Sequence, residues 1–142
     1  MLPLLLPILA HAGTLTVTGD EAAVPPEYAT VQDAVDAASS NDEIVLDSHL
    51  DTFTESVLIT GSGVELTIIG DPLLVSWKAS GTYALRVEDN ASVTLNNVAI
   101  DVGNIEVDDA MLAADGLEMR GTTSASKGGA IQATDSDLTV EN

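Results

Sequence analysis

A short apolar–polar–apolar pattern recurs along the chain at nearly constant spacing. Its copies are Leu66-Thr67-Ile68, Val93-Thr94-Leu95, Leu117-Glu118-Met119 and Leu138-Thr139-Val140, which lie 27, 24 and 21 residues apart. Alternation with a period of two is typical of a strand that buries one face. A repeat of this length is typical of the coils of a solenoid, because a single coil cannot bury its apolar face alone. The sequence therefore predicts a parallel β-helix.

Further segments with strand-like composition, separated by Gly, Asn, Asp and Ser, support this fold class. Glycine at the corners of a coil supplies the positive φ values that tight turns need. The predicted class is all-β, with a core of stacked Val, Leu and Ile. We expect strands at residues 14–18, 43–46, 56–59, 65–69, 83–87, 92–95, 97–102, 117–119, 130–133 and 137–140.

One short helix is expected before the run of strands. Thr30 is a suitable N-cap, and Asp33 three residues later gives an arrangement like a capping box. The first coil of a solenoid exposes apolar interior and unpaired backbone, which a helix at about residues 30–39 would cover. Four apolar residues share one face of this helix: Val31, Ala34, Val35 and Ala38.

The first twelve residues have the form of a secretory leader. An apolar run from Leu2 to Leu9 precedes Ala10-His11-Ala12, an A-x-A cleavage pattern. The run is shorter than the roughly 20 residues that span a bilayer, so we expect no direct membrane insertion. We assign residues 1–12 to a signal peptide and residues 13–142 to one β-helix domain, secreted or at the cell surface.

The charge balance excludes several classes of partner. The chain has 23 acidic and 4 basic residues, for a net charge of −19. A surface this negative repels phosphate backbones and anionic headgroups, so nucleic acid is not expected as a partner. The absence of cysteine from the sequence excludes disulfides and thiolate chemistry.

The last repeat, Leu138-Thr139-Val140, runs to the end of the sequence without a capping pattern. An uncapped coil exposes apolar interior and an unpaired edge. We therefore expect an N-terminal fragment of a longer solenoid, whose downstream β-helix coils are its first partner.

Three segments resemble a known family. Ala29-Thr30-Val31-Gln32-Asp33-Ala34-Val35, Asp42-Glu43-Ile44-Val45-Leu46 and Thr54-Glu55-Ser56-Val57-Leu58-Ile59 resemble the N-terminal cap and first coil of pectate-lyase-like, right-handed parallel β-helix proteins. Gly128-Gly129-Ala130-Ile131 is similar to the GGA[ILV] repeat of the polymorphic outer-membrane proteins, although the Phe-x-x-Asn partner motif is absent. The resemblance covers about residues 29–142 and implies a right-handed parallel β-helix with surface display, associated with the outer membrane.

From this fold and charge we expect an acidic scaffold or adhesin-like protein without catalytic activity of its own, whose partner is a cell-surface glycan or protein. The alternative is the N-terminal part of a polysaccharide lyase or hydrolase of the same fold. Lyase chemistry on a polyanion needs a cationic group, and the bases of the chain are Lys78, Arg86, Arg120 and Lys127. The many carboxylates around them would repel polyuronate, which disfavours the lyase.

Calcium is the one cofactor that the acidic residues suggest. Asp135 and Asp137, two residues apart, are the leading metal candidates, because carboxylates from adjacent coils can converge on an ion that takes six to eight oxygens. Turn capping by the Asp135 side chain, at the position that corresponds to Asp89, is the favoured alternative. A second candidate group is Glu106, Asp108, Asp109 and Asp115.

Three other features have a structural and a functional interpretation. His49, between Asp47 and Asp51, is interpreted as a surface residue rather than a ligand. Trp77, with Lys78 and Tyr83, is interpreted as packing rather than as a sugar-stacking platform. Asn90-Ala91-Ser92 fits the N-glycosylation acceptor pattern at an accessible turn.

Overall fold

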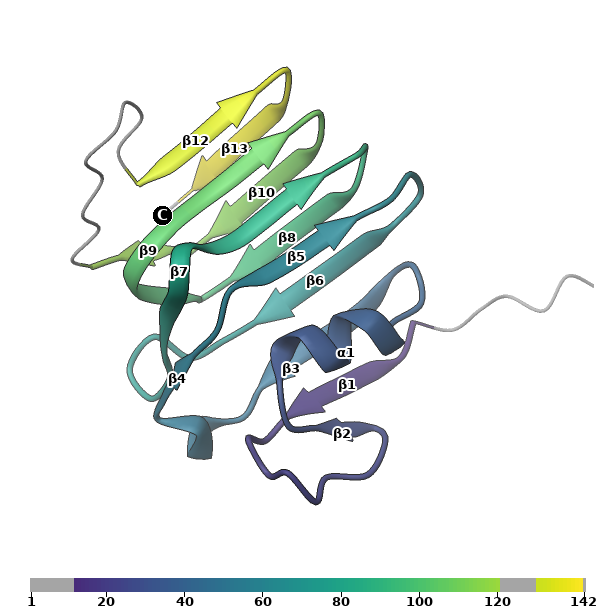
Figure 1. The fold of residues 1–142 in the computed structure, drawn as a ribbon, viewed down its shortest axis with the longest axis vertical. Coiled ribbons are helices and arrows are strands. Elements are labelled where there is room, and N and C mark those ends of the chain that lie inside the picture. The colour runs from purple at the N-terminus through teal and green to yellow at the C-terminus, as the bar shows by residue number, and fades with distance from the viewer. Residues whose placement is uncertain (1–11, 121–129, 142) are drawn as a thin grey trace, which may run out of the picture.

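The computed structural model describes residues 12–120 and 130–141, and this part of the chain is mostly strand with one short α-helix. Parallel strands stack into a β-solenoid of about four turns (Figure 1), which confirms the predicted fold class. The elements are β1 (Thr14–Val17), β2 (Glu27–Tyr28), α1 (Val31–Ala37), β3 (Asp42–Leu46), a 3-10 turn (Ser48–Leu50), β4 (Thr52–Thr54), β5 (Val57–Thr60), β6 (Glu65–Ile69), β7 (Ser76–Glu88), β8 (Ser92–Asn96), β9 (Ala99–Asp108), β10 (Met111–Asp115), β11 (Glu118–Met119), β12 (Ile131–Thr134) and β13 (Asp137–Glu141).

Seven strands form one sheet, sheet A, in the order β13-β10-β8-β6-β3-β1-β2. Its neighbouring strands pair in parallel, so residues of successive coils stand in columns across the sheet. Alternate positions face the interior because side chains of a strand point to opposite faces. One such inward column consists of Leu15, Ile44, Ile68, Leu95, Ala114 and Val140.

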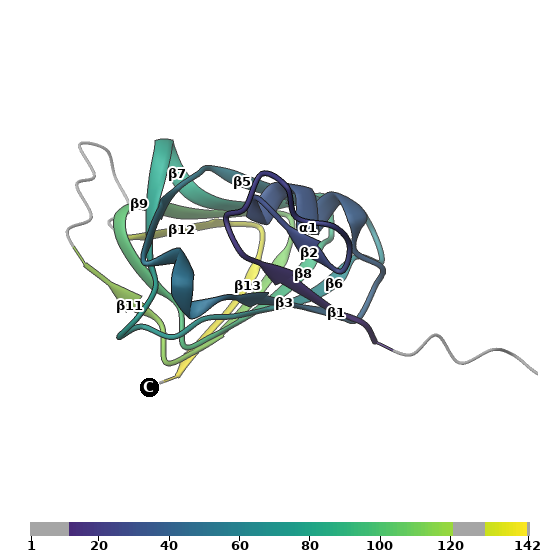
Figure 2. The same ribbon diagram turned by 90° about the horizontal axis from the view of Figure 1, so that it is seen from below.

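The second sheet, sheet B, is built around the long strands β7 and β9. The first parts of these strands pair with β4 and β11, and their last parts pair with β5 and β12. Register shifts between Trp77 and Leu85 mark the bend that separates the two parts. Seen from below in Figure 2, sheets A and B enclose the apolar interior, with α1 and β2 lying across the end of the stack.

Helix α1 begins and is capped as predicted. Thr30 is the N-cap, and its hydroxyl accepts a hydrogen bond from the backbone N–H of Asp33 at 3.0 Å. Val31 and Ala34 are fully buried against the strands of the first coils. The helix ends at Ala37, two residues short of the predicted boundary, and Ala38 follows in extended conformation.

The helix also covers the unpaired edge of β5, as expected for a solenoid cap. The side-chain amide of Gln32 accepts a hydrogen bond from Leu58 N at 2.8 Å and donates one to Leu58 O at 3.1 Å. A neighbouring strand would satisfy the same two backbone groups. One polar side chain on α1 therefore replaces a strand at this edge.

One predicted repeat is wrong. Leu117-Glu118-Met119 does not continue the sheet A column, because β11 (Glu118–Met119) pairs with β9 in sheet B. The matching strand is β10, where Leu112 pairs with Val93 on one side and Leu138 on the other. The true spacing from Leu66 through Val93, Leu112 and Leu138 is therefore 27, 19 and 26 residues.

The irregular spacing comes mainly from the connections that lead from sheet A to sheet B and from the length of the strands that follow. Residues 70–75 connect β6 to β7 but only residues 97–98 connect β8 to β9, and β7 has 13 residues where β9 has 10. The corners that lead back to sheet A vary less. Between sheet B and sheet A the chain turns over residues 61–64, 89–91, 109–110 and 135–136 in successive coils, so the corner shortens from four residues to two. The strand at 111–115, which the sequence analysis missed, follows the first two-residue corner. The predicted strand at 83–87 is part of β7, and the predicted strand at 97–102 overlaps β9, which begins at Ala99. Both observed strands are longer because they continue through the bend.

The final coil leaves inward-facing residues accessible. Leu138 and Val140 are 43% and 46% exposed, whereas their column neighbours Leu112 and Ala114 are buried. Among the predicted features, residues 1–11 of the leader, Gly128 and Gly129 lie outside the described residues. Within the described part of the chain no helix is long and apolar enough to cross a membrane.

Candidate functional site

The corner between sheet B and sheet A carries a column of acidic residues. The register pairs Glu88 with Asp108 and Asp108 with Thr134, so Asp89, Asp109 and Asp135 follow at equivalent positions. Their φ angles are 57°, 48° and 47°, all in the left-handed region that Asp and Asn tolerate better than most residues. The predicted correspondence of Asp135 with Asp89 is confirmed, and the corner geometry explains why a short polar residue stands there.

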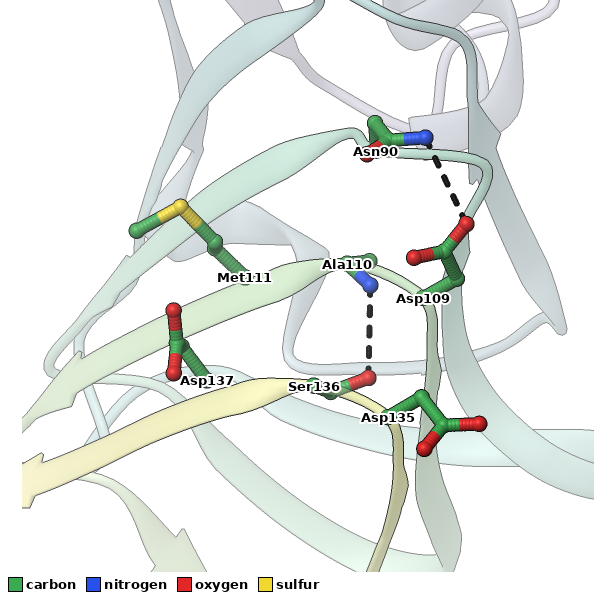
Figure 3. Close-up of a pocket in the computed structure, with 7 residues that line it drawn as sticks. All are labelled: Asn90, Asp109, Ala110, Met111, Asp135, Ser136 and Asp137. Atoms are coloured by element: carbon green, nitrogen blue, oxygen red, sulfur yellow. Dashed lines mark hydrogen bonds between the residues drawn. The ribbon is translucent and has the colours of Figure 1, made fainter.

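An open hollow of about 410 Å³ lies at this corner (Figure 3). Two hydrogen bonds that involve side chains join successive coils within it, in addition to the backbone hydrogen bonds from Asn90 N to Asp109 O and from Asp137 N to Ala110 O. The Ala110 N–H donates to Ser136 Oγ at 3.2 Å, and the Asn90 side-chain amide donates to Asp109 Oδ2 at 3.4 Å. The hollow is lined by Asn90, Asp109, Ala110, Met111, Asp135, Ser136 and Asp137.

The two leading metal candidates both line this hollow but do not converge. In Figure 3 the carboxylates of Asp135 and Asp137 lie on opposite sides of Ser136. Among residues 12–120 and 130–141, no three acidic or histidine side chains gather closely enough to hold an ion. Asp137 starts β13, where its neighbour across the sheet is Met111. The calcium assignment to this pair stays a prediction.

The second acidic group is divided between opposite corners. Glu106 and Asp108 lie on β9, and Asp109 follows at the corner described above. Asp115 lies at the far end of β10, where it pairs with Glu141. The structure therefore does not bring Asp115 to the other three.

The two arginines of the chain contact acidic side chains. Arg86 Nε lies 2.9 Å from Glu88 Oε2 and 3.9 Å from Glu106 Oε2 on the outer face of sheet B. Lys78 lies on β7 beside Thr54 and Val102, while Lys127 lies outside the described residues.

Arg120, which follows β11, contacts the loop between β6 and β7. Its guanidinium contacts the carboxylate of Glu118, and Nη1 lies 3.7 Å from Asp101 Oδ1. Nη2 also donates to the Pro72 carbonyl at 2.9 Å. Each of these contacts positions a loop or a strand end, so the role of Arg120 is structural.

The structure places His49 on the surface and Trp77 in the core, as predicted. His49 is 90% exposed, and its Nδ1 lies 2.6 Å from Asp47 Oδ1. The backbone and side-chain hydrogen bonds from His49 lower the pKa of Asp47. Trp77 is fully buried and stacks on Phe53 with ring centroids 5.3 Å apart, so it presents no surface to a sugar.

Asn90 of the glycosylation pattern is exposed at the corner, and Ala91 is buried. Its left-handed backbone, with φ of 63°, is a second reason for an Asn at this position. The modification stays a prediction.

Sequence reasoning missed the role of Glu55. Its two carboxylate oxygens accept hydrogen bonds from Val31 N at 2.9 Å and Gln32 N at 2.7 Å, the free N–H groups at the start of α1. Burial raises the pKa of the Glu55 carboxyl, and the hydrogen bonds from Gln32 and Val31 oppose that effect. The only sequence signal for this role is the resemblance of the segment at 54–59 to the cap and first coil of the pectate-lyase-like proteins.

The outer face of sheet A offers a second polar surface. The outward column that runs through β3, β6, β8, β10 and β13 consists of Glu43, Thr67, Thr94, Ala113 and Thr139. Shallow hollows of about 160 Å³ and 200 Å³ lie along it, the first beside Thr67 and Thr94, the second beside Thr94 and Thr139. We name this surface the threonine column.

The described part of the chain is a parallel β-solenoid. Comparison of the chain with protein-family models, with curated proteins and with solved structures gave no match.

Proposed function

We propose that this protein is a secreted or surface-displayed scaffold of adhesin type, built on a right-handed β-helix like that of the pectate-lyase-like proteins. The observation that carries the proposal is the threonine column. Thr67, Thr94 and Thr139 place hydroxyl groups on the outer face of separate coils, in one line along the stack. Hydroxyls spaced along a rigid sheet suit a partner that is itself a repeating polymer of hydroxyl groups, namely a cell-surface glycan.

Binding without turnover is the role that the charged residues support. Arg86 is engaged by Glu88 and Glu106, so its charge is partly neutralised and is less available to an anionic substrate. The surrounding carboxylates favour neutral glycans over polyuronates by repulsion. A polysaccharide lyase or hydrolase whose site lies on further coils is the alternative function.

The proposal also covers the location of the protein, its intramolecular partner and a bound ion. The leader directs residues 13–142 out of the cytoplasm, and the GGA element at 128–131 favours display at the outer membrane. The exposed Leu138 and Val140 of β13 favour downstream coils of the same chain as an intramolecular partner. Calcium, held with Asp135 and Asp137, is the proposed stabilising ion.

A glycan-binding assay on the purified chain tests the function. We expect retention on neutral polysaccharides that weakens several-fold in a Thr67→Val, Thr94→Val, Thr139→Val variant, because valine keeps the shape and removes the hydroxyls. Thr52→Val on β4 of sheet B is the matched control and should bind like wild type.

The same samples are assayed for release of sugar ends from pectin, alginate and neutral glycans. We expect no turnover. Turnover that disappears in Arg86→Ala or Lys78→Ala would overturn the scaffold proposal in favour of the enzyme, and equal retention by the triple variant would remove the threonine column as the binding surface.

A further inference from the structure

A carboxylate stands in a column that is otherwise apolar. Asp42 pairs with Leu66 at the start of β3, and the same inward column continues through Val93, Leu112 and Leu138. Only 8% of Asp42 is exposed. A buried carboxylate needs partners that compensate for its lost hydration, and its partners therefore indicate its purpose.

Asp42 joins two distant backbone positions. Its Oδ1 accepts a hydrogen bond from Gly13 N at 2.6 Å, and its Oδ2 accepts one from Ser39 N at 2.7 Å. The Gly13 carbonyl in turn accepts from Glu43 N at 2.9 Å. Gly13 is thus held from both sides at the entrance to β1.

The approach of the carboxylate to this backbone is close. A Cβ atom at Gly13 would lie 3.2 Å from Asp42 Oδ1, which is tighter than most Cβ contacts, so the absence of a side chain lets the carboxylate sit directly on the Gly13 nitrogen. Gly13 is the residue that follows Ala10-His11-Ala12, and Ala12 itself is exposed. The cleavage pattern in the sequence and the contact in the structure meet at the same peptide bond.

We propose that the chain is cut between Ala12 and Gly13 and that the new α-ammonium group of Gly13 forms an ion pair with the buried carboxylate of Asp42. This inference rests on the proposed secretion of the protein. Hydrolysis consumes one water, leaves a carboxylate on Ala12, and turns the Gly13 nitrogen from an amide into a protonated amine. The nitrogen already lies at the position of the ion pair, so a neutral hydrogen bond becomes a charge-assisted one.

The ion pair couples processing to stability. Before the cut, Asp42 is compensated by two neutral N–H groups. After the cut, one of its partners carries a full positive charge at the same distance, and the entrance to β1 becomes more stable. Removal of the leader thus completes the first coil.

The test separates ion pairing from secretion. In the full chain, residues 7–12 are replaced by the recognition sequence of a site-specific protease that cuts directly before Gly13, so cut and uncut protein come from one preparation. We expect the cut to raise the melting temperature by about 3 to 6 °C, and we expect no increase in an Asp42→Asn variant. A second variant, with one serine inserted before Gly13, places the ammonium one residue away and should also show no increase.

An equal increase in melting temperature in all three proteins, or no increase in any of them, would overturn the ion pair. If Asp42→Asn does not fold, the comparison of wild type with the insertion variant provides the same test. The cleavage position is tested independently by exporting the unaltered chain from a bacterial host and measuring the intact mass of the product. We expect a first residue of Gly13. Another N-terminus, or a product that retains its leader, would overturn the processing step and the proposed secretion, whereas loss of the ion pair alone would leave secretion standing.

Discussion

The indole N–H of Trp77 donates a hydrogen bond to the main-chain carbonyl of Glu55, with 2.9 Å between nitrogen and oxygen. The side chain of the same glutamate binds the first N–H groups of α1. Glu55 therefore connects the capping helix, through its side chain, to the stacked pair of Trp77 and Phe53, through its main chain. The N-terminal cap and the coil core are joined through one residue, and replacement of its side chain should weaken the contact with the helix.

Glu55→Gln should lower the free energy of unfolding by about 1–2 kcal/mol near neutral pH. The amide keeps one oxygen acceptor and turns an NH2 group toward a backbone donor of α1. Glu43→Gln, at an exposed position of β3, removes the same charge without these bonds and should change little. Urea unfolding followed by circular dichroism measures both. Equal loss in the two variants would show that net charge, not capping, is responsible.

The same pair of proteins has a predictable pH dependence. Because burial raises the folded-state pKa of Glu55 above the ordinary value of 4.5, the folded state binds this proton more tightly than the unfolded state. The stability that the proton contributes is complete below the unfolded value and is lost as pH rises through the folded pKa. The stability gap between wild type and Glu55→Gln should therefore narrow as the pH rises from about 4.5 toward neutral. A gap that widens over this range would contradict the prediction.

Gly103 should be the most sensitive glycine at the bend of sheet B. Its φ is 107°, and a Cβ there would lie 2.4 Å from the Ala79 Cβ. Gly63 also has positive φ, at 81°, but a Cβ there meets nothing within 4 Å. We expect Gly63→Ala to cost about 1 kcal/mol for backbone strain alone. Gly103→Ala should cost clearly more, about 3 kcal/mol, because the clash adds to the strain. Equal losses, measured by denaturant unfolding, would mean that the bend relaxes around the new methyl group.

The capping helix could be predicted from sequence because its signals are local. Thr30, Asp33 and the apolar stripe that begins at Val31 lie within one short segment. The role of Glu55 was not predictable in this way, since it depends on a contact across more than 20 residues.

The register of the coils was harder to predict from the sequence, because it depends on the lengths of the connections between strands. β10 contains Ala113 and Ala114, which carry little strand signal, yet Ala114 fills an inward column beside Leu95. Leu117-Glu118-Met119 shows better alternation and lies only five residues later. A two-residue corner at Asp109 and Ala110 brings β10, and not residues 117–119, into sheet A. Alternation identified the fold, and the turns decided which segment occupies which sheet.

The calcium assignment predicts a rise in melting temperature with millimolar CaCl₂, because an ion that binds only the folded state stabilises it by mass action. Asp135→Asn with Asp137→Asn should abolish that rise. Asp20→Asn, at an exposed position near the other end of the solenoid, is a control for the general charge effect. NaCl at matched ionic strength controls for screening. No calcium-specific rise in wild type, or a rise that survives the double substitution, would rule out this pair as the site, and the opposed carboxylates of Figure 3 make that a stringent test.

The exposed final coil should make association depend on salt. Leu138 and Val140 face the interior side of β13 and remain 43% and 46% exposed, so a second copy can cover them. With a net charge of −19 on each chain, repulsion opposes contact at low ionic strength. The Debye length falls from about 20 Å near 20 mM salt to about 5 Å near 500 mM, so the oligomer fraction should rise over that range. Light scattering coupled to size exclusion measures it.

Leu138→Glu should suppress this association, because it places a charge on the inward face of the edge strand. Met111→Glu is the matched control: Met111 is 52% exposed, and the added charge is the same, but the residue lies on β10 and not on the final strand. We expect the control to associate nearly as wild type does. Equal suppression by both variants would assign the effect to net charge, and a monomer at both salt concentrations would show that the final coil does not recruit a second copy.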